Sequence, residues 1–160
     1  MKYLKLKIED AVNATKSAVD EGVVAGGGST LAKTAAHLEQ KISKNESKMS
    51  TEEKIGYEIV FKALKSPLRQ IAHNAGKEDP GVVIDAVMKG SKNAGYDALQ
   101  DMMIEDMIAS GIIDPVKVTR NAVANAISAA AILLTTEVAI ADIADKKDDH
   151  AGHDHGMGGY

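Results

Sequence analysis

The sequence contains no cysteine and no tryptophan, and only one phenylalanine and four tyrosines among its 160 residues. The lack of cysteine excludes disulfide frameworks, thiolate catalysis and cysteine-based zinc sites, and it fits a reducing cytoplasm. With so few aromatic side chains, alanine, valine, isoleucine and leucine must fill the core. Small side chains let helices approach closely, so the composition favours packed helices over a sheet sandwich.

The chain also lacks a basic cluster and a long apolar run. Its 19 basic and 23 acidic residues are interspersed and give a formal net charge of −4. This pattern gives no support to nucleic-acid binding, and no run approaches the roughly 18–20 apolar residues that span a bilayer. Residues 1–7 lead directly into a charged amphipathic segment, which argues against a signal peptide. We expect a cytoplasmic protein without nucleic-acid or membrane partners.

Helical periodicity dominates the chain. Apolar residues at spacings of three and four predict an amphipathic helix over residues 5–21, which Gly22 is suited to end. A capping box at Ser50 and Glu53 and the start signal Ser66-Pro67 predict two further, separate helices. In all, further helices are expected over residues 29–43, 50–65, 67–76, 80–88, 101–109 and 115–135.

The segments between these helices leave little room for strands. Residues 95–98 are predicted to be a short strand or a loop, and residues 137–142 alternate too weakly to predict a strand. The fold class is therefore mainly α with minor β, built as about six or seven helices packed on the long helix 115–135.

Three residue patterns suit a functional site. The glycine turn, Gly26, Gly27 and Gly28, precedes a predicted helix, where N–H groups can meet an anion, but a glycine triplet also serves as a helix break. Asp10 lies about 200° around its helix from Ile8, so it points away from the apolar stripe. A solvated aspartate that complements the helix dipole fits the same position. Asp114 before a proline is typical of an N-cap, although its oxygens have capacity beyond one cap.

Three segments carry a resemblance to a known family. They are residues 8–28, with IEDAVNAT leading to DEGVVAGGG; residues 67–76, with PLRQIA; and residues 111–137, with GIIDPVKVTR leading to LTTE. Their order and spacing over about residues 3–142 resemble the group I chaperonin (GroEL) family. The resemblance implies an intermediate-domain helix at residues 1–22, the C-terminal half of an equatorial, ATP-binding domain at 23–142, and a disordered tail at 143–160.

The resemblance also implies a function. Chaperonins are ATP-dependent molecular chaperones that assist protein folding inside a double-ring assembly. By the match of motifs, Asp10 would be the catalytic aspartate that acts on the attacking water, and Gly27 would contact the nucleotide. Asp114 would hydrogen-bond the ribose hydroxyls.

Four further residues correspond to the family's positions around the adenine: Tyr96, Asp97, Ala98 and Ile112. Asp97 stands where the family usually has asparagine, and Leu99 where it usually has alanine. An aspartate cannot donate a hydrogen bond as the amide does, so a contact from Asp97 to the base would differ from that of the family.

Cofactors and partners follow from the same resemblance. ATP, Mg²⁺ and K⁺ are expected for the full subunit, with no metal site predicted in this chain. Expected partners are unfolded client proteins and a co-chaperonin, both through an apical domain absent here, and further copies in a homo-oligomer. The histidines of the tail could hold Ni²⁺ or Zn²⁺ loosely, but we favour a simple flexible tail.

The resemblance places most of the phosphate-binding loop and the Mg²⁺-binding aspartate outside this sequence. We therefore expect a fragment that is inactive alone. The alternative is a self-associating helical module without nucleotide binding, whose apolar faces would drive oligomers.

Overall fold

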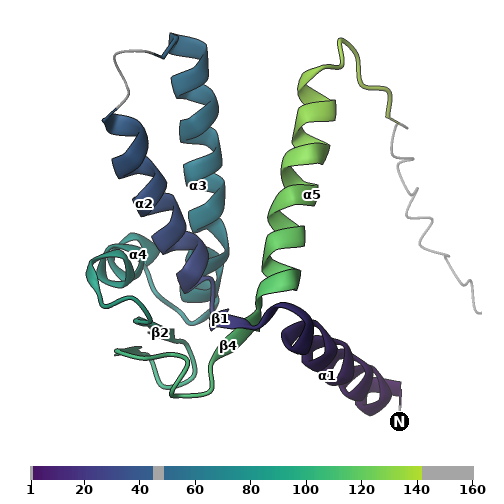
Figure 1. The fold of residues 1–160 in the computed structure, drawn as a ribbon, viewed down its shortest axis with the longest axis vertical. Helices are drawn as coiled ribbons and strands as arrows, with labels where there is room; N and C mark the ends of the chain where they lie inside the picture. Colours follow the sequence, from purple (N-terminus) through teal and green to yellow (C-terminus); the bar gives the residue numbers. More distant parts are fainter. Residues whose placement is uncertain (1, 45–48, 142–160) are drawn as a thin grey trace, which may run out of the picture.

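The computed structural model describes residues 2–44 and 49–141. Within them lie five helices: α1 (Lys2–Glu21), α2 (Ser29–Ser43), α3 (Thr51–Asn74), α4 (Pro80–Lys89) and α5 (Val116–Leu134). The strands are β1 (Val23–Ala25), β2 (Gly95–Asp97), β3 (Met102–Ile104) and β4 (Ile113–Pro115). The predicted fold class, mainly α with minor β, is confirmed (Figure 1). The tail predicted at 143–160, with its histidines, lies outside the described residues.

The core lies between α2, α3 and α4 (Figure 1). One row of α3 residues at helical spacing supplies it: Phe61, Leu64, Leu68 and Ala72 are all buried. Small residues on α2, Ala32 and Ala35, face this row and allow the two helices to pack closely. Apolar residues at helical spacing therefore form the buried faces of these helices.

The predicted break at Ser66-Pro67 is wrong, because α3 is one continuous helix with Pro67 inside it. Proline removes one helical hydrogen bond and costs roughly 3 kcal/mol in a helix interior. The buried row of α3 continues past the proline from Leu64 to Leu68, so burial on both sides offsets that cost. The capping box that starts α3 is confirmed, with Glu53 N donating to Ser50 Oγ and Ser50 N to the Glu53 carboxylate.

Helix α5 is not the centre of packing that the sequence predicts. It contains no buried residue, and the longest described helix is α3 with 24 residues against 19 for α5. The described part of the chain contains five helices rather than six or seven. Figure 1 shows α5 standing beside the α2–α3 pair, and residues 136–141 form no strand. None of the described helices is long and apolar enough to cross a membrane.

The helix predicted at residues 101–109 is also wrong. Met102–Ile104 pair as β3 with β2, with Tyr96 opposite Met103, and a turn follows. The carboxylate of Asp106 stabilises this turn by accepting hydrogen bonds from the backbone N–H groups of Ile108 and Ala109. Such side-chain-to-backbone bonds compete with helix formation, and they favour the turn here.

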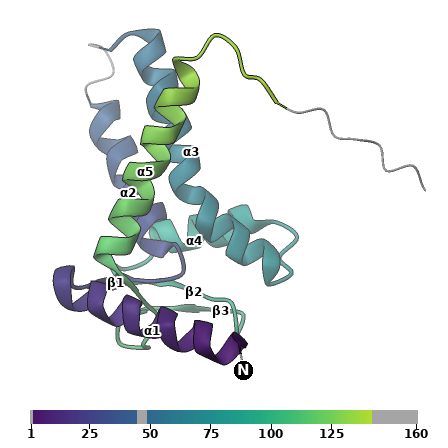
Figure 2. The same cartoon turned by 90° about the vertical axis from the view of Figure 1, so that its right-hand side faces the viewer.

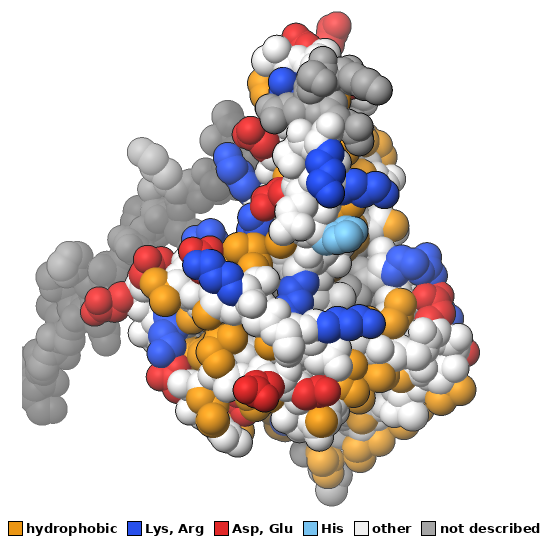
Figure 3. All heavy atoms as spheres, turned by 60° about the vertical axis from the view of Figure 1, so that its left-hand side comes forward, with side chains coloured by type: hydrophobic (Ala, Val, Ile, Leu, Met, Phe, Trp, Pro, Cys, Tyr) orange, Lys and Arg blue, Asp and Glu red, His pale blue; other side chains and the backbone are white. Residues whose placement is uncertain are grey.

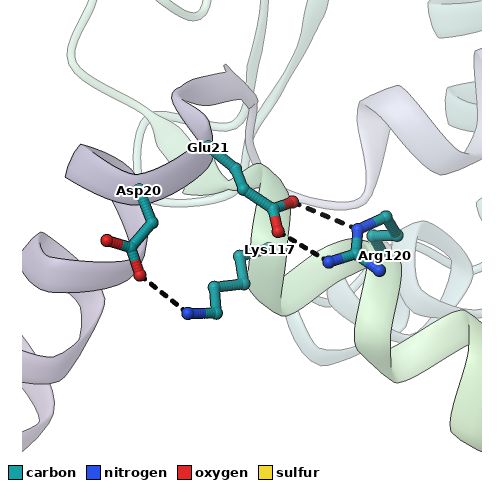
Figure 4. Close-up of polar contacts among 4 residues, drawn as sticks. All are labelled: Asp20, Glu21, Lys117 and Arg120. Atoms are coloured by element: carbon teal, nitrogen blue, oxygen red, sulfur yellow. Dashed lines mark hydrogen bonds and ion pairs between the residues drawn. The ribbon is translucent and has the colours of Figure 1, made fainter.

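Strands β1 and β4 form a second small antiparallel sheet that joins distant segments, with Val24 opposite Asp114. Helix α1 leaves this sheet at one end and runs across the base of the molecule beneath α5 (Figure 2). No residue of α1 is buried. Its last turn is joined to α5 by ion pairs (Figure 4), with Lys117 Nζ 2.7 Å from Asp20 Oδ2 and Arg120 Nη2 2.6 Å from Glu21 Oε1. The hydrogen bond from Arg120 holds the pKa of Glu21 below its ordinary value.

The glycine turn connects the two sheets and the core. Gly28 has a φ of +75°, and a Cβ atom there would lie 2.7 Å from the backbone nitrogen of Leu68 in α3. This approach leaves no space for a side chain, and the left-handed backbone disfavours one as well.

We predict that Gly28→Ala destabilises the protein by about 2–4 kcal/mol, because it adds left-handed strain to a clash with backbone that cannot move aside. Gly56 offers a matched control, since it lies within α3 and a Cβ atom added there would have no neighbouring atom within 4 Å. Gly56→Ala is expected to stabilise by about 0.8–1 kcal/mol through helix propensity. Urea unfolding measures both; equal effects of the two substitutions would contradict this description of the turn.

Candidate functional site

A cavity of about 720 Å³ lies between the glycine turn and the β2–β3 hairpin. Its volume is within the range of roughly 300–1,000 Å³ that small-molecule sites occupy. Five of the residues that the sequence singled out line it: Gly27, Tyr96, Asp97, Ala98 and Ile112. These residues come from three segments far apart in the sequence, so the fold brings them together.

The glycine turn forms one side of this cavity because its backbone reaches the segment before β4. Gly26 N donates to Ile112 O at 2.9 Å, which extends the β1–β4 pairing by one bond. A Cβ atom at Gly26 would lie 3.1 Å from the backbone of Ile112 and Ile113. Gly27 follows at a φ of +64° and faces the cavity without a side chain.

The β2–β3 hairpin forms the opposite side. Gly95 begins it, where a Cβ atom would collide with Ser29 and Met107, so the hairpin packs directly on the start of α2. The carboxylate oxygen Oδ1 of Asp97 accepts hydrogen bonds from Leu99 N at 2.8 Å and Gln100 N at 3.2 Å. Asp97 thus uses one of its oxygens to shape the turn, which leaves its second oxygen for a ligand.

Tyr96 holds the hairpin to the core. It is only 3% exposed and belongs to the buried cluster that includes Leu68 and Ala72. Its hydroxyl donates to Asp101 Oδ1 at 2.7 Å, and this bond raises the pKa of Tyr96 to about 12. Tyr96 is therefore a neutral hydrogen-bond donor at physiological pH, and it lines the cavity as a packing residue.

Asp114 lines a second cavity of about 330 Å³, which shares Gly27 and Ile71 with the first. Its expected role as an N-cap is wrong, because α5 begins at Val116 with Pro115 as the cap residue and no side-chain capping bond. Asp114 is instead the central residue of β4. Burial raises its pKa above the ordinary value of 3.8, so the fold places this carboxylate where its charge is disfavoured.

Asp10 lies apart from these residues. Its side chain is exposed on α1, and it lines neither of the two cavities. The structure does not bring it together with the other predicted site residues, so its catalytic role stays a prediction.

The charges around the two cavities limit what they can hold. Their carboxylate residues are Asp97, Glu105 and Asp114, and no lysine or arginine lines either cavity. Lys and Arg side chains do lie on the face that Figure 3 displays, interspersed with acidic and apolar ones. The lining suits an apolar planar group and hydroxyls that donate to carboxylates, but it does not neutralise phosphates. Within the described ranges, no group of three or more His, Cys, Asp or Glu side chains could hold a metal ion.

Several lining residues escaped prediction from the sequence. These are Ile71, Gln100, Glu105 and Ser110, together with the β3 residues Met102, Met103 and Ile104. The β3 residues were missed because a helix was predicted there. Turn-forming polar residues between Tyr96 and Met102 were the available signal for a hairpin.

Two comparisons with known proteins bear on this site. A family model described as the TCP-1/cpn60 chaperonin family matches residues 1–144. Among solved structures, the chain is similar to the open-state monomer of a group II chaperonin from Methanococcoides burtonii, with a TM-score of 0.61 and 27% sequence identity. That match covers 71% of this chain and 28% of the relative, so the chain spans under a third of the relative's length.

We predict that Asp114→Asn stabilises the folded chain at pH 7. Because burial raises the folded pKa of Asp114, stability is lost as the pH rises through the window between 3.8 and that raised value. The asparagine amide carries no charge, so the variant does not lose this stability as the pH rises. Its advantage in free energy of unfolding over the wild type should vanish near pH 3, where the carboxyl is protonated in both the folded and the unfolded state. Thermal unfolding at the two pH values measures it, with Asp85→Asn on the exposed side of α4 as the control. A loss of stability at pH 7 would contradict the assignment.

Proposed function

Because the chain belongs to the TCP-1/cpn60 chaperonin family, we propose that it forms part of an ATP-dependent chaperone subunit and supplies the nucleoside side of its nucleotide site. Family membership supports a chaperone role. The three sequence motifs favour a group I subunit, which acts on unfolded client proteins in a double ring together with a co-chaperonin. The absence of cysteine fits a cytoplasmic subunit.

The observation that carries this proposal is the convergence of three segments on one cavity. The turn at Gly27, residues 96–98 in β2 and the turn after it, and Ile112 are separated along the chain. The family resemblance predicts each of them as a nucleotide contact without reference to its position in space. A pocket lined mainly by apolar groups with a few polar ones is typical of a small-molecule site.

Each residue has a definite role in this proposal. Ile112 and the hairpin provide apolar surfaces for the adenine. From the adjoining second cavity, which shares Gly27 and Ile71 with the first, Asp114 offers carboxylate oxygens that accept hydrogen bonds from ribose hydroxyls. Gly27 permits close approach of the nucleotide to the backbone. The unfavourable burial of the Asp114 charge is typical of a functional residue, since such groups are retained at a cost in stability.

The phosphates of ATP need charge that this lining does not contain. In the proposed subunit, Mg²⁺ and K⁺ accompany ATP, whose hydrolysis supplies the free energy of the folding cycle. Asp10 acts on the attacking water only if α1 moves relative to the cavity, because its exposed side chain lies outside the lining. For this chain alone we therefore propose nucleoside binding without hydrolysis.

Titration followed by NMR tests this proposal. The chain should bind adenosine and Mg·ATP with similar, weak affinity, with a Kd on the order of 1 mM, because the phosphates make few contacts. Ile112→Glu, which places a charge in the cavity, should weaken binding by about tenfold or more. Ile108→Glu provides the matched control, since Ile108 is close in sequence but lines neither cavity. No binding at about 10 mM adenosine, or an equal loss in both variants, would contradict the proposal.

A second function is favoured by a separate observation. An apolar groove of about 320 Å³ lies between α3 and α5, lined entirely by apolar residues that include Leu31, Ile59, Ala126 and Ile127. Helix α5 carries no charged residue after Arg120. Helix α5 buries no residue and exposes large apolar side chains, among them Ile127, Ile132 and Leu133, so a self-associating module without nucleotide binding is the alternative.

Self-association through this groove predicts a concentration-dependent dimer with a weak Kd, on the order of 100 μM. Ala126→Glu should abolish it, because the glutamate would place a charge in the groove. Ala129→Glu makes the same change on α5 outside the groove lining and should leave association intact. Sedimentation velocity measures both. A wild-type chain that remains monomeric, or equal effects of the two glutamates, would rule out the alternative.

A further inference from the structure

The β2–β3 hairpin supplies most of the lining of the larger cavity, on both of its strands and its turn. Each strand has only three residues. A two-stranded hairpin is at best marginally stable by itself, so its position depends on the anchors that tie it to the rest of the fold. The position of the hairpin in turn sets the width of the cavity.

The base of the hairpin is anchored by bonds to the loop after α4. Ser91 Oγ donates to Glu105 O at 2.7 Å, and Met107 N donates to Asn93 O at 3.0 Å. These bonds hold the chain where it enters and leaves the hairpin. They do not reach its turn, at residues 98–101.

The turn is anchored separately, through Asp101. Its Oδ1 atom accepts the Tyr96 hydroxyl at 2.7 Å and lies 2.5 Å from Lys77 Nζ. The same ammonium lies 5.9 Å from the centroid of the Tyr96 ring. Asp101 has a φ of 55°, and it is the one non-glycine residue of the described ranges at a positive φ. Aspartate and asparagine tolerate this conformation better than other side chains, so the residue type fits both the turn and the contact.

Lys77 is fixed to the end of α3. It follows Gly76, which has a φ of +84°, and its backbone N donates to Ala72 O at 3.1 Å in a helix C-cap arrangement. Ala72 is fully buried in the cluster that also contains Tyr96. The ammonium of Lys77 therefore extends from a rigid part of the core to the turn.

We propose that Lys77, Asp101 and Tyr96 form a clamp that fixes the turn of the β2–β3 hairpin to the end of α3 and so sets the width of the nucleoside cavity. Lys77 and Asp101 are positioning residues, since neither lines the cavity. A half-exposed ion pair is weak alone. Here its carboxylate also accepts a hydrogen bond from a buried tyrosine, and a charge-assisted bond in such surroundings is stronger. The identity of the ligand rests on the proposed function, whereas the clamp itself does not.

Hydrogen exchange of the full chain tests the clamp directly. In Lys77→Met and in Asp101→Asn, amides of Gly95–Asp97 and Met102–Ile104 should exchange about three- to tenfold faster, while those of α2 and α3 stay unchanged. Asparagine keeps the turn conformation and a hydrogen-bond acceptor for Tyr96, so Asp101→Asn removes the charge alone. Lys77→Arg keeps the positive charge, so its hairpin amides should exchange at the wild-type rate. Asp85→Asn makes the same charge change on α4, at a distance from the hairpin in sequence, and serves as the control.

Adenosine titration of the same variants tests whether Lys77 and Asp101 position the hairpin for ligand binding. Lys77→Met and Asp101→Asn should bind about threefold or more weakly, in proportion to the looser hairpin. Unchanged hairpin exchange, or equal acceleration in Asp85→Asn, overturns the clamp. Faster exchange with unaltered adenosine affinity overturns its positioning role. If the wild type binds no adenosine, the proposed function is contradicted, and hydrogen exchange alone then decides whether the clamp exists.

Discussion

The close approach of the glycine turn to its neighbours is the constraint on which the rest of the site depends. Gly26 lies against the backbone of Ile112 and Ile113, and Gly28 lies against the backbone of Leu68. A side chain at either position would separate α2 from α3 or β1 from β4. Glycine in this turn is therefore required for three features at once: the start of α2, the β1–β4 sheet and one side of the cavity.

This constraint explains why the lining can be assembled from three distant segments. The turn joins β1 to α2, and α2 in turn packs on Gly95 at the start of the hairpin. Lys33 of α2 reinforces this arrangement by donating to the backbone carbonyls of Ser91 and Lys92 in the loop before β2. The carboxylates of the lining give the assembled site a preference for hydroxyls over phosphates, which is why we assign to it the nucleoside part of a nucleotide.

The sequence predicts this fold best where the determining interactions are local. The capping box of Ser50 and Glu53 is such a case, and so is the start of α4, where Asp79 Oδ1 accepts from Gly81 N. Prediction fails where tertiary contacts dominate. Pro67 does not end its helix, because a continuous buried row outweighs one lost hydrogen bond.

The residues of the site, too, were predicted where local sequence determines them and missed where tertiary contacts do. The family resemblance predicted Gly27, Ile112 and residues 96–98, which line one cavity. Gly27 and Ile112 lie in segments with a distinctive local pattern, whereas residues 96–98 lie between such segments and depart from the family at Asp97. The β3 side of the hairpin could not be found this way, since strand pairing is a contact between segments. The prediction of an N-cap at Asp114 was wrong for the same reason. Asp114 pairs with β1 as part of β4, and α5 begins only at Val116.

Intermolecular nuclear Overhauser effects in the adenosine complex would show whether a nucleoside occupies the cavity between the glycine turn and the hairpin. We predict contacts from the adenine protons to the methyl groups of Ile112 and Ala98, which line that cavity. Contacts to Ala126 and Ile127 instead would place the ligand in the groove between α3 and α5 and would contradict nucleoside binding in the cavity.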